Sequence, residues 1–206
     1  MNPVQILMMN QQSESEYTPD VYLYNWRAIK DPKFAVEGWT SLTVDYANYI
    51  EQYCDYFGTG GLKDNKLGLF ERSSSNGSLI NYISNSVVLW LKEEATYASA
   101  GRIFWYYNGT GYYRDNIYGQ DSEPYNTGLA TIIMKYSTTN PGTVTDYDGN
   151  EYTTVKFGNY IFTVEPWKCK HLNDGTEIPY ITDDYNWISA SGIAMCGVDT
   201  VNEVVC

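Results

Sequence analysis

The chain has 206 residues, of which 43% are apolar and 18% charged, so it can form a hydrophobic core and does not read as generally disordered. Its 25 acidic against 13 basic residues give a formal net charge of −12, which argues against nucleic acid as a partner. The longest uninterrupted apolar run covers residues 87–91. This run is far shorter than the roughly 18 apolar residues of a membrane-spanning helix, so we expect no membrane span.

The N-terminal segment, residues 1–20, is expected to form an arm. A moderately apolar start is followed by a polar stretch over 11–16 and by Pro19. Such an arm either docks on a neighbouring subunit or stays disordered. The start has no basic segment and no long apolar stretch, so we expect synthesis in the cytoplasm without a signal peptide.

Residues 21–206 are expected to form a single α+β domain. The residue pattern is helical to about residue 97 and β-rich over 100–206. Residues 21–29 read as a short strand. Apolar residues recur at spacings of three and four over 41–57 and again over about 78–95, which predicts two helices in the N-terminal half. Residues 62–77, between these helices, are expected to be a loop.

The C-terminal half carries the signals of a mostly antiparallel sheet. Asn108-Gly109 lies between aromatic runs and predicts a hairpin, and residues 129–136 read as a buried strand. Turns at 148–150 and 158–159 separate three strand runs and predict a β-meander over about 143–165. Within it, Val155 and Phe157 are expected to pack inward with Ile161 or Phe162. Residues 185–205 are expected to be one or two closing strands.

The acidic turn at residues 146–151 is the candidate metal site. Asp146, Asp148 and Asn150 could offer oxygen ligands to Ca²⁺, although the spacing is not that of an EF-hand. The alternative is an ordinary hairpin turn, in which Asp, Gly and Asn are the expected residues. The turn interpretation is favoured, so no cofactor is expected apart from this candidate Ca²⁺.

His171 is the only histidine, and it lies two residues from Cys169. A nucleophilic Cys–His pair would need an orienting partner, which the sequence does not name. Paired carboxylates for hydrolysis are recognised by their separation in space, and nothing in the sequence singles out two of the 25 acidic residues. The hydrolase hypothesis therefore ranks last.

Tyrosine is the outlier of the composition, with 21 residues. Its apolar ring and polar tip suit both sheet packing and contact surfaces. An aromatic run in the predicted hairpin could form a platform for carbohydrate, with the residues Trp105, Tyr106, Tyr107, Tyr112 and Tyr113.

The favoured functional hypothesis is a non-enzymatic structural subunit of a large assembly. The favoured example is a tailed-phage virion protein, such as a capsid decoration, neck, tail or fibre component. Such a protein is synthesised in the cytoplasm without a signal peptide and functions outside the cell. Its expected partners are other subunits, including further copies of itself in a homo-oligomer. The alternatives are a carbohydrate- or receptor-binding module built on the tyrosines and tryptophan, and a hydrolase that uses carboxylates or the Cys169/His171 pair.

Overall fold

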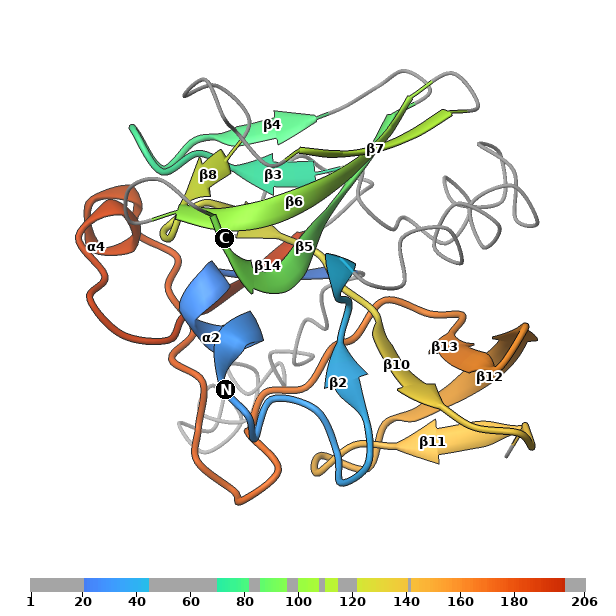
Figure 1. Ribbon diagram of the computed structural model, residues 1–206. Coiled ribbons are helices and arrows are strands. Elements are labelled where there is room, and N and C mark those ends of the chain that lie inside the picture. The colour runs from blue at the N-terminus through green and yellow to red at the C-terminus, as the bar shows by residue number, and fades with distance from the viewer. Residues whose placement is uncertain are drawn as a thin grey trace, which may run out of the picture.

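The computed structural model describes residues 21–44, 70–81, 86–95, 100–107, 110–114, 122–140 and 142–198. These residues form mainly antiparallel β-sheets, and they contain two short helices, α2 (Trp26–Lys30) and α4 (Asp184–Ile188). Figure 1 shows the sheet that contains β10, β12 and β13 on one side of the molecule and α4 on the other. The β-rich character predicted from the sequence is confirmed, whereas the two predicted N-terminal helices are not.

The described residues form three sheets. The first has the order β14-β1-β9-β3-β4, the second β11-β12-β13-β10-β2, and the third β5-β6-β7 with β8 also paired to β6. The first comprises β1 (Val21–Tyr24), β3 (Phe70–Arg72), β4 (Leu79–Asn81), β9 (Gly128–Leu129) and β14 (Met195–Val198). The second comprises β2 (Thr40–Ser41), β10 (Ile133–Tyr136), β11 (Thr143–Thr145), β12 (Glu151–Phe157) and β13 (Tyr160–Thr163). The third comprises β5 (Ser86–Glu94), β6 (Ala100–Tyr107), β7 (Thr110–Arg114) and β8 (Ser122–Pro124).

The helix predicted over 78–95 is wrong, because these residues contribute the strands β4 and β5. Val88, Leu89, Trp90 and Leu91 are all buried, so β5 is covered on both faces. A strand that is buried on both faces loses the alternation of apolar and polar residues, and a short apolar run then resembles a buried helix. The β-branched residues of this run favour the strand.

The other predicted helix, over 41–57, lies largely outside the described residues. Its first residue, Ser41, instead belongs to the strand β2, which pairs with β10. The loop predicted over 62–77 is wrong at residues 70–72, which form β3. The Gly77 end of this loop is confirmed as a turn, since Gly77 has a φ of 75° and its N–H donates to the carbonyl of Ser73.

The strand predicted over 21–29 ends at Tyr24 because Asn25 caps a helix. The Asn25 side chain accepts a hydrogen bond from the N–H of Ala28 at 3.1 Å, and α2 follows. A similar correction applies near the C-terminus, where residues 185–205 were expected to be strands. Asp183 accepts from the N–H of Asn186 and caps α4, and the predicted closing strand is β14.

The meander predicted over about 143–165 is confirmed. Strands β11, β12 and β13 pair antiparallel in sequence order, and Gly149 and Gly158 have φ values of 83° and 57°. The turn predicted at Asn108-Gly109 lies outside the described residues, and the strands on either side of it pair antiparallel, with Tyr107 in β6 opposite Thr110 in β7. The buried strand predicted over 129–136 is divided between β9 and β10.

The predicted inward face of the meander is only partly correct. Val155 is paired with Phe162, and the Phe157 and Phe162 rings lie 6.1 Å apart, as expected for inward packing. Tyr152 and Thr154, which alternate with these residues, are buried, whereas Val155 and Phe157 are only half-buried. The reason is that Tyr152 stacks on Trp167, with ring centres 4.3 Å apart, so the β12 strand is covered on its second face.

The core consists of two clusters that share the same strands. In β1, Leu23 belongs to the first cluster and Tyr24 to the second, and in β5 the same holds for Leu89 and Trp90. Successive side chains of a strand point to opposite faces, so β1 and β5 separate the two clusters. The second cluster holds most of the buried tyrosine and tryptophan, namely Tyr22, Tyr24, Trp26, Trp90, Tyr152 and Trp167.

Candidate functional site

The candidate Ca²⁺ residues are engaged in internal hydrogen bonds. Asp146 is only 6% exposed, and its carboxylate accepts from the N–H and the side-chain amide of Asn150 and from the hydroxyl of Tyr152 at 2.6 Å. Asp148 accepts from the N–H of Lys170 and contacts the imidazole of His171. In the described part of the chain, no three His, Cys, Asp or Glu residues are grouped to hold a metal ion. The geometry is that of a turn stabilised by its own side chains.

Cys169 and His171 have different environments. Cys169 is a buried thiol, and the hydroxyl of Tyr24 donates to its carbonyl at 2.8 Å and lies 4.0 Å from its sulfur. Burial raises the pKa of the Cys169 thiol well above its ordinary value, against the lowering effect of the Tyr24 contact. A nucleophilic cysteine needs the opposite shift. The His171 side chain is 35% exposed and pairs with Asp148.

The candidate aromatic platform lies on the β6–β7 hairpin. Trp105 is paired with Tyr112, and Tyr113 is paired with Phe104. Directly opposed positions share a face of a sheet and neighbouring positions alternate. By register, positions 105, 107 and 112 therefore belong to one face and positions 106 and 113 to the other. The side chains of these residues lie outside the described part of the structure.

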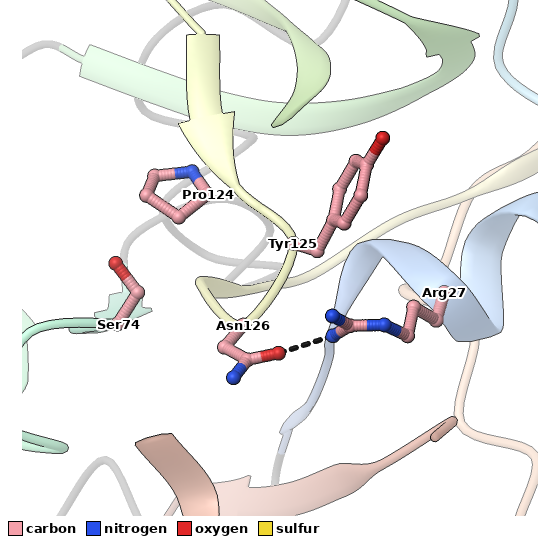
Figure 2. Close-up of a pocket in the computed structure, with 5 residues that line it drawn as sticks. All are labelled: Arg27, Ser74, Pro124, Tyr125 and Asn126. Carbon is pink, nitrogen blue, oxygen red and sulfur yellow. Dashed lines mark hydrogen bonds between the residues drawn. The ribbon is translucent and has the colours of Figure 1, made fainter. Parts of the chain in front are cut away.

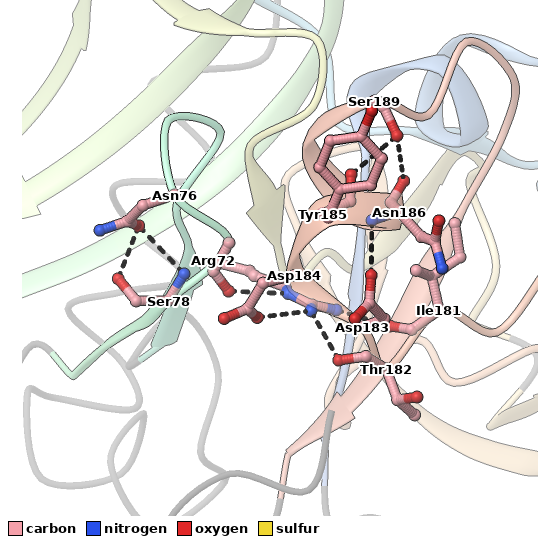
Figure 3. A network of polar contacts seen from close by, with 11 residues as sticks. Arg72, Asn76, Ser78, Ile181, Thr182, Asp183, Asp184, Tyr185, Asn186 and Ser189 are labelled. Carbon is pink, nitrogen blue, oxygen red and sulfur yellow. Dashed lines mark hydrogen bonds and ion pairs between the residues drawn. The ribbon is translucent and has the colours of Figure 1, made fainter.

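Arg72 forms the most extensive polar contacts of a single buried side chain (Figure 3). It is fully buried, and its guanidinium donates to the carbonyls of Gly77, Ile181 and Thr182 at 3.0, 2.5 and 2.9 Å. It also pairs with Asp184 at 3.1 Å. These bonds hold the β3–β4 turn against the segment before α4, so Arg72 has a structural role.

A pocket of about 180 Å³ is the candidate binding site (Figure 2). It lies between α2, the β3–β4 turn and the chain at the end of β8, and Figure 2 shows its lining residues coming from these three places, with Arg27 and Asn126 in contact. The lining residues are Arg27, Ser74, Pro124, Tyr125 and Asn126. Aromatic and proline rings with a few polar groups are the usual composition of a small-molecule site.

The pocket wall is held in place by contacts from α2. The N–H of Trp26 donates to the carbonyl of Tyr125 at 3.0 Å, and the two rings stack with centres 4.7 Å apart. The hydroxyl of Tyr125 donates to Glu94, which also pairs with Lys30 at 3.6 Å. Tyr125 is therefore fixed at its backbone, at one ring face and at its hydroxyl.

Arg27 and Asn126 close the other side of the pocket. Arg27 Nη1 donates to the side-chain oxygen of Asn126 and to the carbonyl of Ala190 at 3.3 Å. The Asn126 amide donates to the carbonyl of Ile188 at 2.7 Å. The Arg27 guanidinium carbon lies 5.2 Å from the centre of the Tyr125 ring, which is close enough for a cation–π contact. Burial lowers the pKa of Arg27 from its ordinary value, but a guanidinium stays charged in proteins.

The pocket was missed by sequence reasoning. Its residues come from three distant parts of the chain, and none of them belongs to a motif. The one local signal was Asn25, whose preference for the first position before a helix could have placed α2 and the side chain of Arg27 beside it.

Exposed tyrosines form a second feature of functional interest. Tyr185 is 73% exposed, Tyr136 63% and Tyr147 55%, and Tyr180 is 40% exposed. Tyr185 belongs to α4 and Tyr136 to β10, which Figure 1 shows on opposite sides of the molecule. The excess of tyrosine is visible in the sequence, but no local pattern distinguishes these four positions from the other tyrosines.

No helix among the described residues is both long enough and apolar enough to cross a membrane. Comparison of the chain with protein-family models, with curated proteins and with solved structures finds no significant match.

Proposed function

We propose that this chain is a non-enzymatic structural subunit of a large assembly and that it contacts other subunits through its surface tyrosines. The observation that carries the proposal is the exposure of Tyr136, Tyr147, Tyr180 and Tyr185. Tyrosine is enriched in protein interfaces because its large ring loses little conformational freedom on binding and its hydroxyl tolerates water. Neighbouring subunits would cover rings that are otherwise in contact with solvent.

The positions of these tyrosines favour contacts between unlike surfaces. Tyr185 belongs to α4 and Tyr136 to β10, and Figure 1 shows these two elements on opposite sides of the molecule, so one subunit can meet two neighbours at once. Contacts between two different surfaces of identical subunits generate rings or filaments. This arrangement supports a homo-oligomer in which copies join head to tail.

The most specific form of the proposal is a virion protein, such as a capsid decoration, neck, tail or fibre component of a tailed phage. It is supported by a tyrosine-rich, acidic composition and by antiparallel sheets, both of which suit a protein that works outside cells. The commitment of Asp146, Asp148 and Cys169 to internal contacts supports a structural rather than a catalytic role.

The proposal is tested by sedimentation velocity of the purified chain over a range of concentrations. We expect concentration-dependent association that Tyr185→Asp and Tyr136→Asp each weaken, because loss of an interface anchor costs about 2 kcal/mol or more, which is roughly 30-fold in affinity. Tyr185→Phe and Tyr136→Phe keep the ring and are the matched controls. A chain that stays monomeric at every concentration, or association that both aspartate variants leave unchanged, would overturn the proposal.

A further inference from the structure

The pocket beside α2 contains hydrogen-bond donors that the fold does not use. Arg27 donates through Nη1 only, and among the described residues its Nε and Nη2 have no hydrogen-bond partner. The hydroxyl of Ser74, on the facing wall, likewise has no partner within the described ranges. A guanidinium carries five N–H groups in a planar fork, so Arg27 retains donors that match a carboxylate.

The charge around the pocket favours an anion. Among the described residues, Arg27 is the only charged one that lines the pocket, and none of the described lining residues carries a carboxylate. Glu94 contacts the Tyr125 hydroxyl, where it is paired with Lys30. Lys30 Nζ also lies 4.8 Å from the centre of the Trp26 ring behind Tyr125. In a chain with a net charge of −12, this wall is a local exception to the overall sign.

The volume of the pocket and its apolar walls limit which group can carry the carboxylate. The volume of about 180 Å³ accommodates a single six-membered ring, since an engineered cavity of about 150 Å³ holds benzene. Pro124 offers a ring surface, on which the C–H face of a sugar ring can pack, and Ser74 and Asn126 offer polar groups to its hydroxyls.

We propose that this pocket binds a carboxylate-bearing monosaccharide, with Arg27 pairing with the carboxylate, Ser74 with a ring hydroxyl, and Pro124 packing on the ring. The site is separate from the exposed tyrosines through which subunits are proposed to meet. Binding by a monomer is therefore sufficient, and the inference does not depend on assembly.

Calorimetry with the full chain and glucuronate, glucose and acetate as probes tests the proposal. For a ligand of this size in an open pocket we expect a glucuronate dissociation constant on the order of 1 mM. Glucose lacks the carboxylate and acetate lacks the ring, so each should bind at least about tenfold more weakly, since a charge-assisted hydrogen bond and ring contacts are each worth that much. Equal affinity for glucuronate and glucose, equal affinity for glucuronate and acetate, or no glucuronate binding at millimolar concentrations would overturn it.

Two variants locate the binding. Arg27→Gln should weaken glucuronate at least about tenfold and leave glucose unchanged. Arg27 also donates to the carbonyl of Ala190, so the melting temperature of the Arg27→Gln variant is measured as well, to detect a loss of stability. Ser74→Phe, in an exposed turn, should block the pocket and abolish binding of glucuronate, whereas Ser75→Phe at the neighbouring exposed position, which does not line the pocket, should not. Glucuronate binding that Ser74→Phe leaves intact would place the ligand elsewhere and contradict the proposal.

Discussion

The guanidinium of Arg72 lies 4.6 Å from the centre of the Trp187 ring, so a residue at the end of β3 packs directly on a residue of α4. Both side chains are buried, and the arginine also bonds three backbone carbonyls and the side chain of Asp184. One side chain thereby joins two parts of the chain that are far apart in sequence.

Replacing Arg72 by Met should lower the free energy of unfolding by about 3 kcal/mol or more, because three backbone carbonyls lose a charged donor. The Asp184 side chain is 63% exposed, so Asp184→Asn should cost only about 0.2–1 kcal/mol. Urea unfolding of both variants measures the difference. Similar small costs for the two would show that the carbonyl bonds contribute little.

Asp146 should be a stability residue rather than a metal ligand. Asp146→Ala removes the acceptor for Asn150 and for the Tyr152 hydroxyl and should cost about 2–4 kcal/mol, more than the small cost expected from a simple turn. Tyr152→Phe keeps the stack on Trp167, and a double-mutant cycle with Asp146→Ala should show coupling of about 0.5–3 kcal/mol. The melting temperature should not rise with Ca²⁺. A Ca²⁺-dependent rise that Asp146→Ala abolishes would restore the metal-site hypothesis.

Two glycines of the meander should resist substitution because of their backbone conformation. Gly149 has a φ of 83° with open space around it, and Gly158 has a φ of 57°. Replacing either by Val should cost about 1–3 kcal/mol through backbone strain alone. Gly192 also has open space but no positive φ, so Gly192→Val is the matched control. Thermal unfolding that ranks all three variants alike would contradict a conformational cause.

The ion pair of Lys33 and Asp174 should contribute an acid-sensitive part of the stability. A hydrogen bond from Lys33 at 2.7 Å, with help from Thr176, lowers the pKa of Asp174 from 3.8 to about 2. A depressed folded-state pKa stabilises the protein above the unfolded-state pKa, and this contribution is lost as the pH falls from 3.8 towards 2.

Denaturant unfolding of wild type and Lys33→Met between neutral pH and pH 2 tests this. The difference in unfolding free energy between the two should be constant above pH 4 and shrink as the pH falls from about 4 to about 2. A difference that stays constant through that window would show that the pair does not set the Asp174 titration.

The thiol of Cys169 should be inert in the folded protein and reactive in the unfolded one, because it is buried and its pKa is raised by burial. We expect all four cysteines to react with a thiol reagent after unfolding without prior reduction. Protein kept from air oxidation that shows fewer than four reactive thiols on unfolding would instead contain a bridge or a metal site.

The meander could be predicted from the sequence because its information is local. Gly149 and Gly158 mark turns whose backbone conformation few other residues adopt, and the strands between them alternate. The strand β5 could not be recognised, because Leu89 and Trp90 are buried in different core clusters and the alternation disappears. Burial on the second face is decided by elements elsewhere in the chain.

In the candidate sites, too, the local turns could be predicted from the sequence, whereas the contacts between distant parts of the chain could not. Asp146 and Asp148 were recognised as turn residues from their neighbours, but their bonds to Tyr152 and His171 depend on how the turn packs. The pocket of Arg27 and Tyr125 exists only because α2 stacks on a turn from a distant part of the chain. No spacing in the sequence encodes that contact, so pattern reasoning could not find it.

The strand β1 lies inside the first sheet between β14 and β9, with Val21 paired to Val198 and Tyr24 to Met195. A ribosome synthesises residues 21–24 long before residues 195–198. The strand β1 therefore cannot pair with β14 until nearly all of the described chain has been synthesised. Formation of the sheet is therefore a late event, and pairing over such a separation is slow. During that interval β1 presents an apolar strand with unpaired backbone groups, which is a template for aggregation until its neighbours pair with it.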